Sequence, residues 1–110
     1  MIKTVGLLTR KSGWTHEQFV EHWVGTHAPL AHKVPGLRRY VQNHILGERT
    51  RADIEATQVE IDGIAELWFD DQAALVTASR TPEMKALHAD GALFIGRIKS
   101  FVVEEQVIIP

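Results

Sequence analysis

The sequence predicts an α+β domain in which four strands and two helical regions follow one another in the order β-α-β-β-α-β. Two observations carry this prediction. Runs of apolar residues that are continuous or alternate with polar residues, as strands require, occupy residues 2–9, 37–46, 64–69 and 100–109. Helix start signals separate these runs, one at Thr15 and one at Thr81. Because 110 residues suffice for only one hydrophobic core, we expect a single domain, residues 1–110.

The first helix is predicted to begin at Thr15, which stands three residues before Gln18 as in a capping box. At ~100° per residue, its apolar residues fall in one stripe that also includes His16 and His27. The stripe comprises Phe19, Val20, Trp23, Val24, Leu30 and Ala31. Pro29 has no N–H and its ring presses on the carbonyl of Gly25, so we expect the helix to kink or end near His27.

The middle of the chain is predicted to form two strands joined by a long loop. Val34-Pro35-Gly36 is predicted to end the helix. The strand over 37–46 has apolar and polar residues on both faces, so neither face is wholly apolar. Residues 47–59 are polar and aperiodic, which predicts a loop that could act as a flap. In the strand over 64–69, Leu67 alternates with Glu66 and Trp68, so these two share the opposite face.

The last third of the chain is predicted to hold a short helix over 72–78, capped by Asp70 or Asp71, and a second helix from Pro82. That second helix should fray near Gly91, with a further turn over 92–96 before the last strand. The whole order describes a ferredoxin-like fold, a four-stranded antiparallel sheet with helices on one face. Since the chain has nothing left to cover the other face, we expect a homodimer closed by the two sheets.

Composition excludes several classes of function. A net charge of -2 offers no field that gathers nucleic acid or anionic lipid, and no segment resembles a signal peptide or a membrane span. The chain has no cysteine, which removes thiolate sites and fits a cytoplasmic protein. Histidines are numerous, but His22 and His27 are five residues apart, the wrong spacing for two ligands on one helix face, so we expect no metal site.

Four motifs together resemble the EthD family of dimeric α+β barrel proteins. They are H-x-x-F-x-x-H-W-x-x-x-H-A-P-L-A from His16, P-G-L-x-x-Y from Pro35, D-G-I-A-E-L-W-F-D from Asp62 and F-V-V-E-E from Phe101. The chain is also similar to the methylmuconolactone methylisomerases, through T-H-E-Q-F and I-D-G-I-A-E-x-W-F. That resemblance implies a cysteine where this chain has Leu67, so the absence of a thiol argues against that particular reaction.

The family resemblance implies a cavity between helix and sheet, a catalytic His27, and Tyr40 as its companion, with Asn43 or His44 nearby. His27 also lies on the apolar stripe, and an imidazole can take and return a proton near neutral pH. The alternative is a core histidine bonded to a carbonyl that Pro29 frees. Tyr40 is either an oxyanion donor or an ordinary strand aromatic. If the strand is regular, at most one of Asn43 and His44 faces the cavity.

Other candidates have structural readings as well. Trp23, Trp68 and Phe94 are core residues or an aromatic wall that binds substrate, together with Leu67. His22 is read as a surface residue of the helix, or as a dimer or tail contact. Glu66 is expected to pair with Arg38 or Arg39 on the dimer side, and Asp90 is read as a helix-end residue without a chemical role.

The resemblance and the residues lead to three hypotheses. The first is an enzyme that needs no cofactor and moves protons on a small aromatic, lactone or polyketide-type compound, as an isomerase or a lyase. The second is an oxidoreductase role, as a cofactor-free oxygenase or a monooxygenase accessory. The third is a dimer that binds a small molecule without chemistry.

Overall fold

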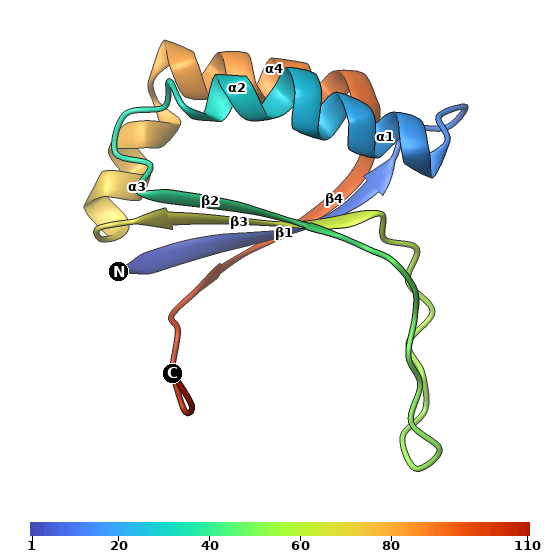
Figure 1. Ribbon diagram of the computed structural model, residues 1–110. Coiled ribbons are helices and arrows are strands. Elements are labelled where there is room, and N and C mark those ends of the chain that lie inside the picture. Colours follow the sequence, from blue (N-terminus) through green and yellow to red (C-terminus); the bar gives the residue numbers. More distant parts are fainter.

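The computed structural model describes residues 1–110 and has two layers, a sheet and the helices that cover one of its faces (Figure 1). The four strands are β1 (Ile2–Arg10), β2 (Arg39–His44), β3 (Gly63–Phe69) and β4 (Ile95–Val103). They pair antiparallel in the order β2-β3-β1-β4. The predicted ferredoxin-like fold is therefore confirmed.

The first helical region starts as predicted but does not stop at Pro29. Thr15 caps α1 (His16–His22), and its capping box with Gln18 is complete. The chain then widens into a π-helix, η1 (Trp23–His27), and continues as α2 (Ala28–Ala31). Pro29 has no N–H to give Gly25, and a π turn, in which the N–H of Ala28 bonds to the carbonyl of Trp23, absorbs the mismatch without ending the helix. Of the two predicted alternatives, a kink or an end near His27, the structure shows a distortion of the helix that ends at His27 and no end of the helix.

The second helical region confirms both predicted caps and corrects the predicted end. Asp71 caps α3 (Gln72–Ser79) and Thr81 caps α4 (Pro82–Phe94). The helix α4 runs through Gly91 instead of fraying there, because Gly91 is buried and packs toward Ile95 and His27. Tertiary packing outweighs the low helix propensity of glycine at this position.

The last strand begins five residues earlier than predicted and ends six residues earlier. Gly96 makes the direct passage from α4 into β4 possible, because a Cβ there would lie 2.8 Å from the carbonyl oxygen of Arg10. The strand pairs with β1 from Ile95 to Val103. Residues 104–110 do not pair, so the predicted strand over 100–109 is correct only in its first four residues.

Alternation along the strands decides which residues face the helices. On β1 and β3 these are Thr4, Gly6, Leu8, Ala65, Leu67 and Phe69, and on β2 and β4 they include Tyr40, Gln42, Ile98 and Ser100. The buried apolar residues form two separate clusters against this face. One contains Leu8, Phe19, Trp23 and Phe94, and the other contains Ala31, Val34, Phe69, Ala78, Met84 and Leu87. The core is therefore split in two, with space left between its halves.

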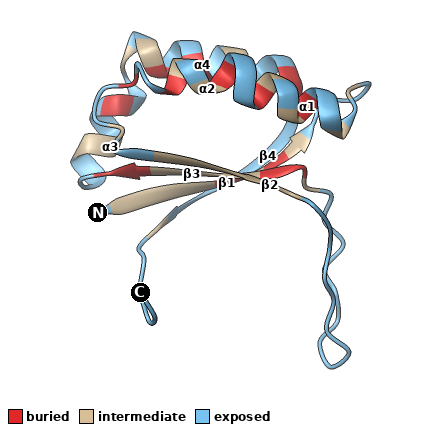
Figure 2. Ribbon diagram, viewed as in Figure 1, coloured by how far each residue is buried: buried red, intermediate tan, exposed pale blue.

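The opposite face of the sheet carries no helix, and its strands are intermediate or exposed along most of their length (Figure 2). The predicted loop is confirmed, since no helix or strand occurs between His44 and Gly63. This loop and the segment after Val103 both extend away from the helix layer, past the bare face of the sheet (Figure 1). None of the helices is long and apolar enough to cross a membrane.

Candidate active site

A cavity of about 600 Å³ lies between the two halves of the core, with the sheet on one side and η1 and α4 on the other. Its lining is mostly apolar. The polar side chains that reach it are Thr4, His27, Tyr40, Ser79, His88 and Ser100. A mainly apolar hollow with a few converging polar groups is the usual form of a small-molecule site.

His27 enters this cavity from the π-helix and is 8% exposed. Its Nδ1 lies 2.7 Å from Oδ2 of Asp90, while its Nε2 has no hydrogen bond within the protein and is not fully buried. Burial lowers the pKa of His27 below 6.5, although the hydrogen bond and the charge of Asp90 act against this shift. The ring is thus neutral near pH 7, and its unbonded nitrogen is a base available to a ligand in the cavity.

Asp90 also contacts His22, which lies one helical turn before His27. Nε2 of His22 is 3.1 Å from Oδ1 of Asp90, and both side chains are largely buried. The rings of His22 and His27 pack on Phe94 from the same helix as Asp90. The readings of His22 as a surface residue and of Asp90 as a helix-end residue were therefore wrong, because the two side chains turn toward each other in the contact between helices.

Tyr40 lines the cavity from β2, opposite Leu67 in the register. Gln42 fixes its hydroxyl, since the Gln42 amide donates both to Tyr40 Oη and to the backbone carbonyl of Trp23, each at 2.9 Å. Burial raises the pKa of Tyr40, with the Gln42 and Trp23 side chains acting in the opposite direction. The phenol therefore stays protonated, and its O–H can donate a hydrogen bond to an oxygen atom in the cavity.

Of the residues predicted to bind substrate, Leu67 and Trp23 line the cavity and three others do not. Phe94 is fully buried behind the histidines, so it is a core residue and not a wall. Asn43 donates to Glu66, and Trp68 donates to Glu105, on the face of the sheet away from the helices. Strand alternation puts both side chains there, and their predicted place in the cavity was wrong.

His44, predicted to be catalytic, faces the helices but lies outside the cavity lining. Its ring packs against Trp23 with centroids 5.2 Å apart, and its Nε2 is 3.1 Å from Oε1 of Gln42. The chain of contacts from His44 through Gln42 to Tyr40 makes it a support for the tyrosine. Its predicted place among the residues that meet a ligand was thus wrong.

The bare face of the sheet carries a charged cluster around Glu66. Lys3 pairs with Glu66 at 2.5 Å, and the guanidinium of Arg39 lies over the ring of Trp68. The hydrogen bond from Lys3 lowers the pKa of Glu66. The predicted partner of Glu66 was Arg38 or Arg39, but Arg38 pairs with Asp70 at the strand end. Glu66 pairs instead with Lys3, its diagonal neighbour on β1, two residues from Val5, which lies opposite Glu66.

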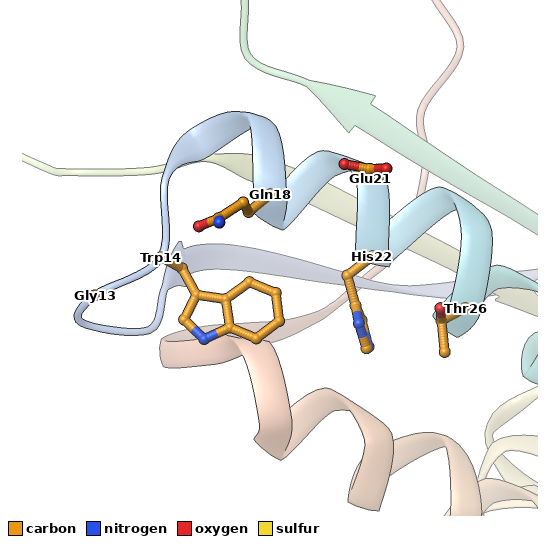
Figure 3. A pocket seen from close by; sticks show the side chains of 6 residues that line it. All are labelled: Gly13, Trp14, Gln18, Glu21, His22 and Thr26. Carbon is orange, nitrogen blue, oxygen red and sulfur yellow. The ribbon is translucent and has the colours of Figure 1, made fainter.

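A groove of about 470 Å³ lies on the outer side of the same helix contact and is lined by Gly13, Trp14, Gln18, Glu21, His22 and Thr26. In Figure 3, Trp14 and His22 point from their segments toward α4. His22 thus borders the groove while Asp90 connects it to His27 in the cavity.

Sequence reasoning missed Asp90, Gln42 and His88 as parts of the site. A signal for Asp90 was available: it follows Leu87 by three residues and precedes Phe94 by four, so it lies within the apolar stripe of α4. A carboxylate inside an apolar stripe requires a buried partner. No group of three or more histidine, aspartate or glutamate side chains is arranged to hold a metal ion.

The fold defines a class, the ferredoxin-like α+β proteins with a four-stranded antiparallel sheet covered by helices on one face. The EthD domain family model matches residues 11–98, and the chain belongs to the EthD family. It is 32% identical over 108 residues to a 4-carboxymethyl-4-methylbutenolide mutase of Pseudomonas reinekei, a match that covers 97% of this chain and all of the mutase. An ethyl tert-butyl ether D family protein of Bacillus halodurans has a similar structure, with a TM-score of 0.78 and 31% identity over 96% of this chain and 99% of that chain.

More distant structures share the fold alone. The cofactor-independent oxygenase SnoaB of Streptomyces nogalater superposes with a TM-score of 0.66 at 14% identity, over 99% of this chain and 96% of that chain. A dimeric ferredoxin-like protein of Thermobifida fusca does so with a TM-score of 0.68 at 18% identity, over 93% of this chain and 88% of that chain.

Proposed function

We propose that this protein is an isomerase that needs no cofactor and moves a proton on a small unsaturated lactone carrying a carboxylate. The observation that carries the proposal is the Asp90–His27 pair, whose free Nε2 faces an apolar cavity that the Tyr40 hydroxyl also reaches. The similarity to a butenolide mutase over nearly the whole chain supports both the reaction class and the lactone.

The chemistry follows from these two groups. Nε2 of His27 takes a proton from a carbon next to a carbonyl, and the charge that develops on the carbonyl oxygen is stabilised by a hydrogen bond from Tyr40. The carboxylate of Asp90 stabilises the imidazolium that forms. In 4-carboxymethyl-4-methylbutenolide the ring carbon C4 carries no hydrogen, so the proton comes from the carboxymethyl group and the C4–O bond breaks to give an open-chain diene dicarboxylate. The carboxylate at the other end then closes a lactone ring on the carbon beside C4, while the imidazolium returns the proton to the carbon next to the released carboxylate. One C–O bond breaks and one forms, so that no proton, electron or co-reactant is gained or lost.

Leu67 separates this proposal from any mechanism that uses a thiol at the same strand position. An isobutyl side chain cannot attack or donate, so it contributes only surface for the apolar part of a ligand. The proposal therefore assigns the proton transfer to His27, with Tyr40 as the hydrogen-bond donor.

An anionic substrate is favoured by the second hollow that reaches Tyr40. This hollow, of about 400 Å³, lies between α2 and β2, and its charged or chargeable lining residues are His32, Arg38 and Arg39. No carboxylate side chain lines it. Arg38 also pairs with Asp70 and the guanidinium of Arg39 lies over Trp68, so the attraction of this hollow for an acid is weak and supports the proposal only by its sign.

The test is turnover of 4-carboxymethyl-4-methylbutenolide and of related butenolides without the methyl group, followed by proton NMR in D₂O. We expect an isomeric lactone and deuterium at the carbon that receives the proton. His27→Gln should lower kcat by roughly 10²- to 10⁴-fold, and Tyr40→Phe by roughly 10²-fold. Lys85→Gln, a change at an exposed residue of α4 that lines none of these hollows, is the control and should keep wild-type kcat. Full turnover by His27→Gln, or oxygen consumption without isomer, would refute the proposal.

We further propose that the protein is a homodimer in which the bare sheet faces meet. The charged cluster of Lys3, Glu66 and Arg39 lies on that face together with Trp68, and the exposed Phe101 extends it. Light scattering should give twice the chain mass of 12.4 kDa. A monomer at micromolar concentration would overturn this assignment without touching the cavity.

A further inference from the structure

We propose that Asp90 and His22 are positioning residues for His27: Asp90 keeps the proton of His27 on Nδ1, and His22 links the state of the outer groove to the basicity of the ring. The inference rests on the proposed role of His27 as the base. The carboxylate of Asp90 on α4 contacts two imidazoles of the first helical region, those of His22 and His27. Three hydrogen-bond contacts carry the inference.

The first step is the tautomer. An ionised carboxylate only accepts hydrogen bonds, so the nitrogen of His27 that lies 2.7 Å from Asp90 must carry a proton. A neutral imidazole has one N–H, and Nε2 is then left with its lone pair. Since Nε2 is the nitrogen without a partner in the protein, Asp90 presents the basic nitrogen to the cavity.

The second step is the shared carboxylate. His22 donates to Asp90 through Nε2, at 3.1 Å from Oδ1 and 3.2 Å from Oδ2. The hydrogen bond from His27 to Asp90 is shorter than those from His22. Because both imidazoles donate to the same carboxylate, each hydrogen bond weakens the other. A positive charge on His22 therefore reduces what Asp90 can give to the imidazolium of His27 and also repels it directly.

The third step is access. His22 borders the groove on the outside of the helix contact, whereas His27 borders the inner cavity, and Asp90 is the only residue that bonds to both. A molecule in the groove can therefore contact His22 without entering the inner cavity. The other titratable groups that face His27 are His88 from α4 and Tyr40 from β2.

Nitrogen-15 NMR of the labelled full-length protein tests the inference without any substrate. Long-range proton–nitrogen spectra show which nitrogen of each imidazole carries the proton, and a pH series gives the titration midpoints. In the wild type, neutral His27 should carry its proton on Nδ1. Asp90→Asn keeps the size and an acceptor oxygen but removes the charge, and should lower the midpoint of His27 by roughly one pH unit.

The role of His22 is tested with His22→Gln, which retains an N–H donor but cannot titrate. The midpoint of His27 should rise, because the charge of His22 acts to lower the pKa of His27 and glutamine carries none. His32→Gln is the matched control and should leave the midpoint in place. A wild-type Nε2–H tautomer, or an unchanged midpoint in Asp90→Asn, would overturn the role of Asp90, and equal effects of His22→Gln and His32→Gln would overturn that of His22.

Turnover then separates this inference from the proposed function. With an active lactone, Asp90→Asn should lower kcat at least tenfold with little change in KM, and His22→Gln should move the acid limb of kcat/KM toward higher pH together with the NMR midpoint. Absence of turnover in the wild type would refute the proposed function, while the NMR series would still decide the tautomer and the coupling.

Discussion

Replacing Gly63 with alanine should destabilise the protein and open its cavity. A Cβ at this position would overlap Cζ3 of Trp23 and would lie 2.7 Å from Cη2 of the same ring, closer than Cβ atoms approach other heavy atoms. The backbone cannot retreat, because β3 is bonded on both sides and Gly63 pairs with Leu8 of β1 and His44 of β2. The indole must therefore move, and it lines the cavity.

The loss of folding free energy in Gly63→Ala can be expressed as a change in Tm. Overpacking of this kind costs about 1–3 kcal/mol. Unfolding entropy is about 2.1 cal/mol/K per residue, or roughly 230 cal/mol/K for 110 residues, so that each kcal/mol lowers Tm by about 4 °C. We expect calorimetry of Gly63→Ala to show a Tm lowered by about 4–13 °C.

Trp23→Phe in the same protein tests the cause. The smaller ring makes room for the new methyl group, so the double variant should be more stable than the sum of the two single changes by at least ~1 kcal/mol. Gly25→Ala is the control, since nothing lies within 4 Å of its Cβ position, and alanine should raise helix stability there by up to about 1 kcal/mol. A wild-type Tm for Gly63→Ala, or strict additivity in the double variant, would refute the reasoning.

Three further predictions concern charged groups and one turn. Burial raises the pKa of Asp62, but hydrogen bonds from the Arg10 N–H, from His16 and from the Arg10 guanidinium outweigh burial and lower the pKa overall. The stability that these hydrogen bonds supply is therefore complete above about pH 4, and it is lost as the pH falls through the pKa of Asp62 in the folded protein. Denaturant melts of Asp62→Asn should accordingly differ from the wild type by about 3 kcal/mol at pH 7 and by less near pH 3, and a constant difference would contradict this account. Because burial lowers the pKa of His27, the acid limb of kcat/KM should fall below pH 6.5 in the wild type, and a limb above that value would exclude His27 as the base. Gly96→Ala should lower the yield of folded protein in circular dichroism, since its Cβ would meet the Arg10 carbonyl at 2.8 Å, whereas Gly47→Ala should not.

The sequence predicted those parts of the fold that short-range chemistry determines. Both Thr15 and Thr81 cap helices as expected, because the hydroxyl that serves the exposed N–H groups is set within three residues. The ends that failed depend on distant partners. The helix α4 continues through Gly91 because His27 and Ile95 pack there, and no local pattern contains that information.

The sequence predicted those residues of the candidate site whose position follows from the periodicity of the helix or strand in which they lie. His27 was found from the apolar stripe, and Tyr40 and Leu67 from strand alternation together with the family motifs. Alternation alone already placed Trp68 on the face opposite Leu67, so both could not line one cavity. Asp90 was missed because its role depends on a contact with His27, a residue of another helix that is 63 positions away in the chain.

The Asp90 contact is hard to explain as a device for stability. Bringing a carboxylate and two imidazoles into a helix contact costs desolvation free energy, and apolar residues of similar size commonly pack there at no loss. The π-helix adds a second cost, since its widened turn is an unfavourable way to continue past Pro29. Both features converge on the same residue: the π turn ends at His27, and the carboxylate holds its Nδ1. Two costs in stability thus orient one imidazole in an apolar cavity, which is the arrangement that the proposed proton transfer by His27 needs.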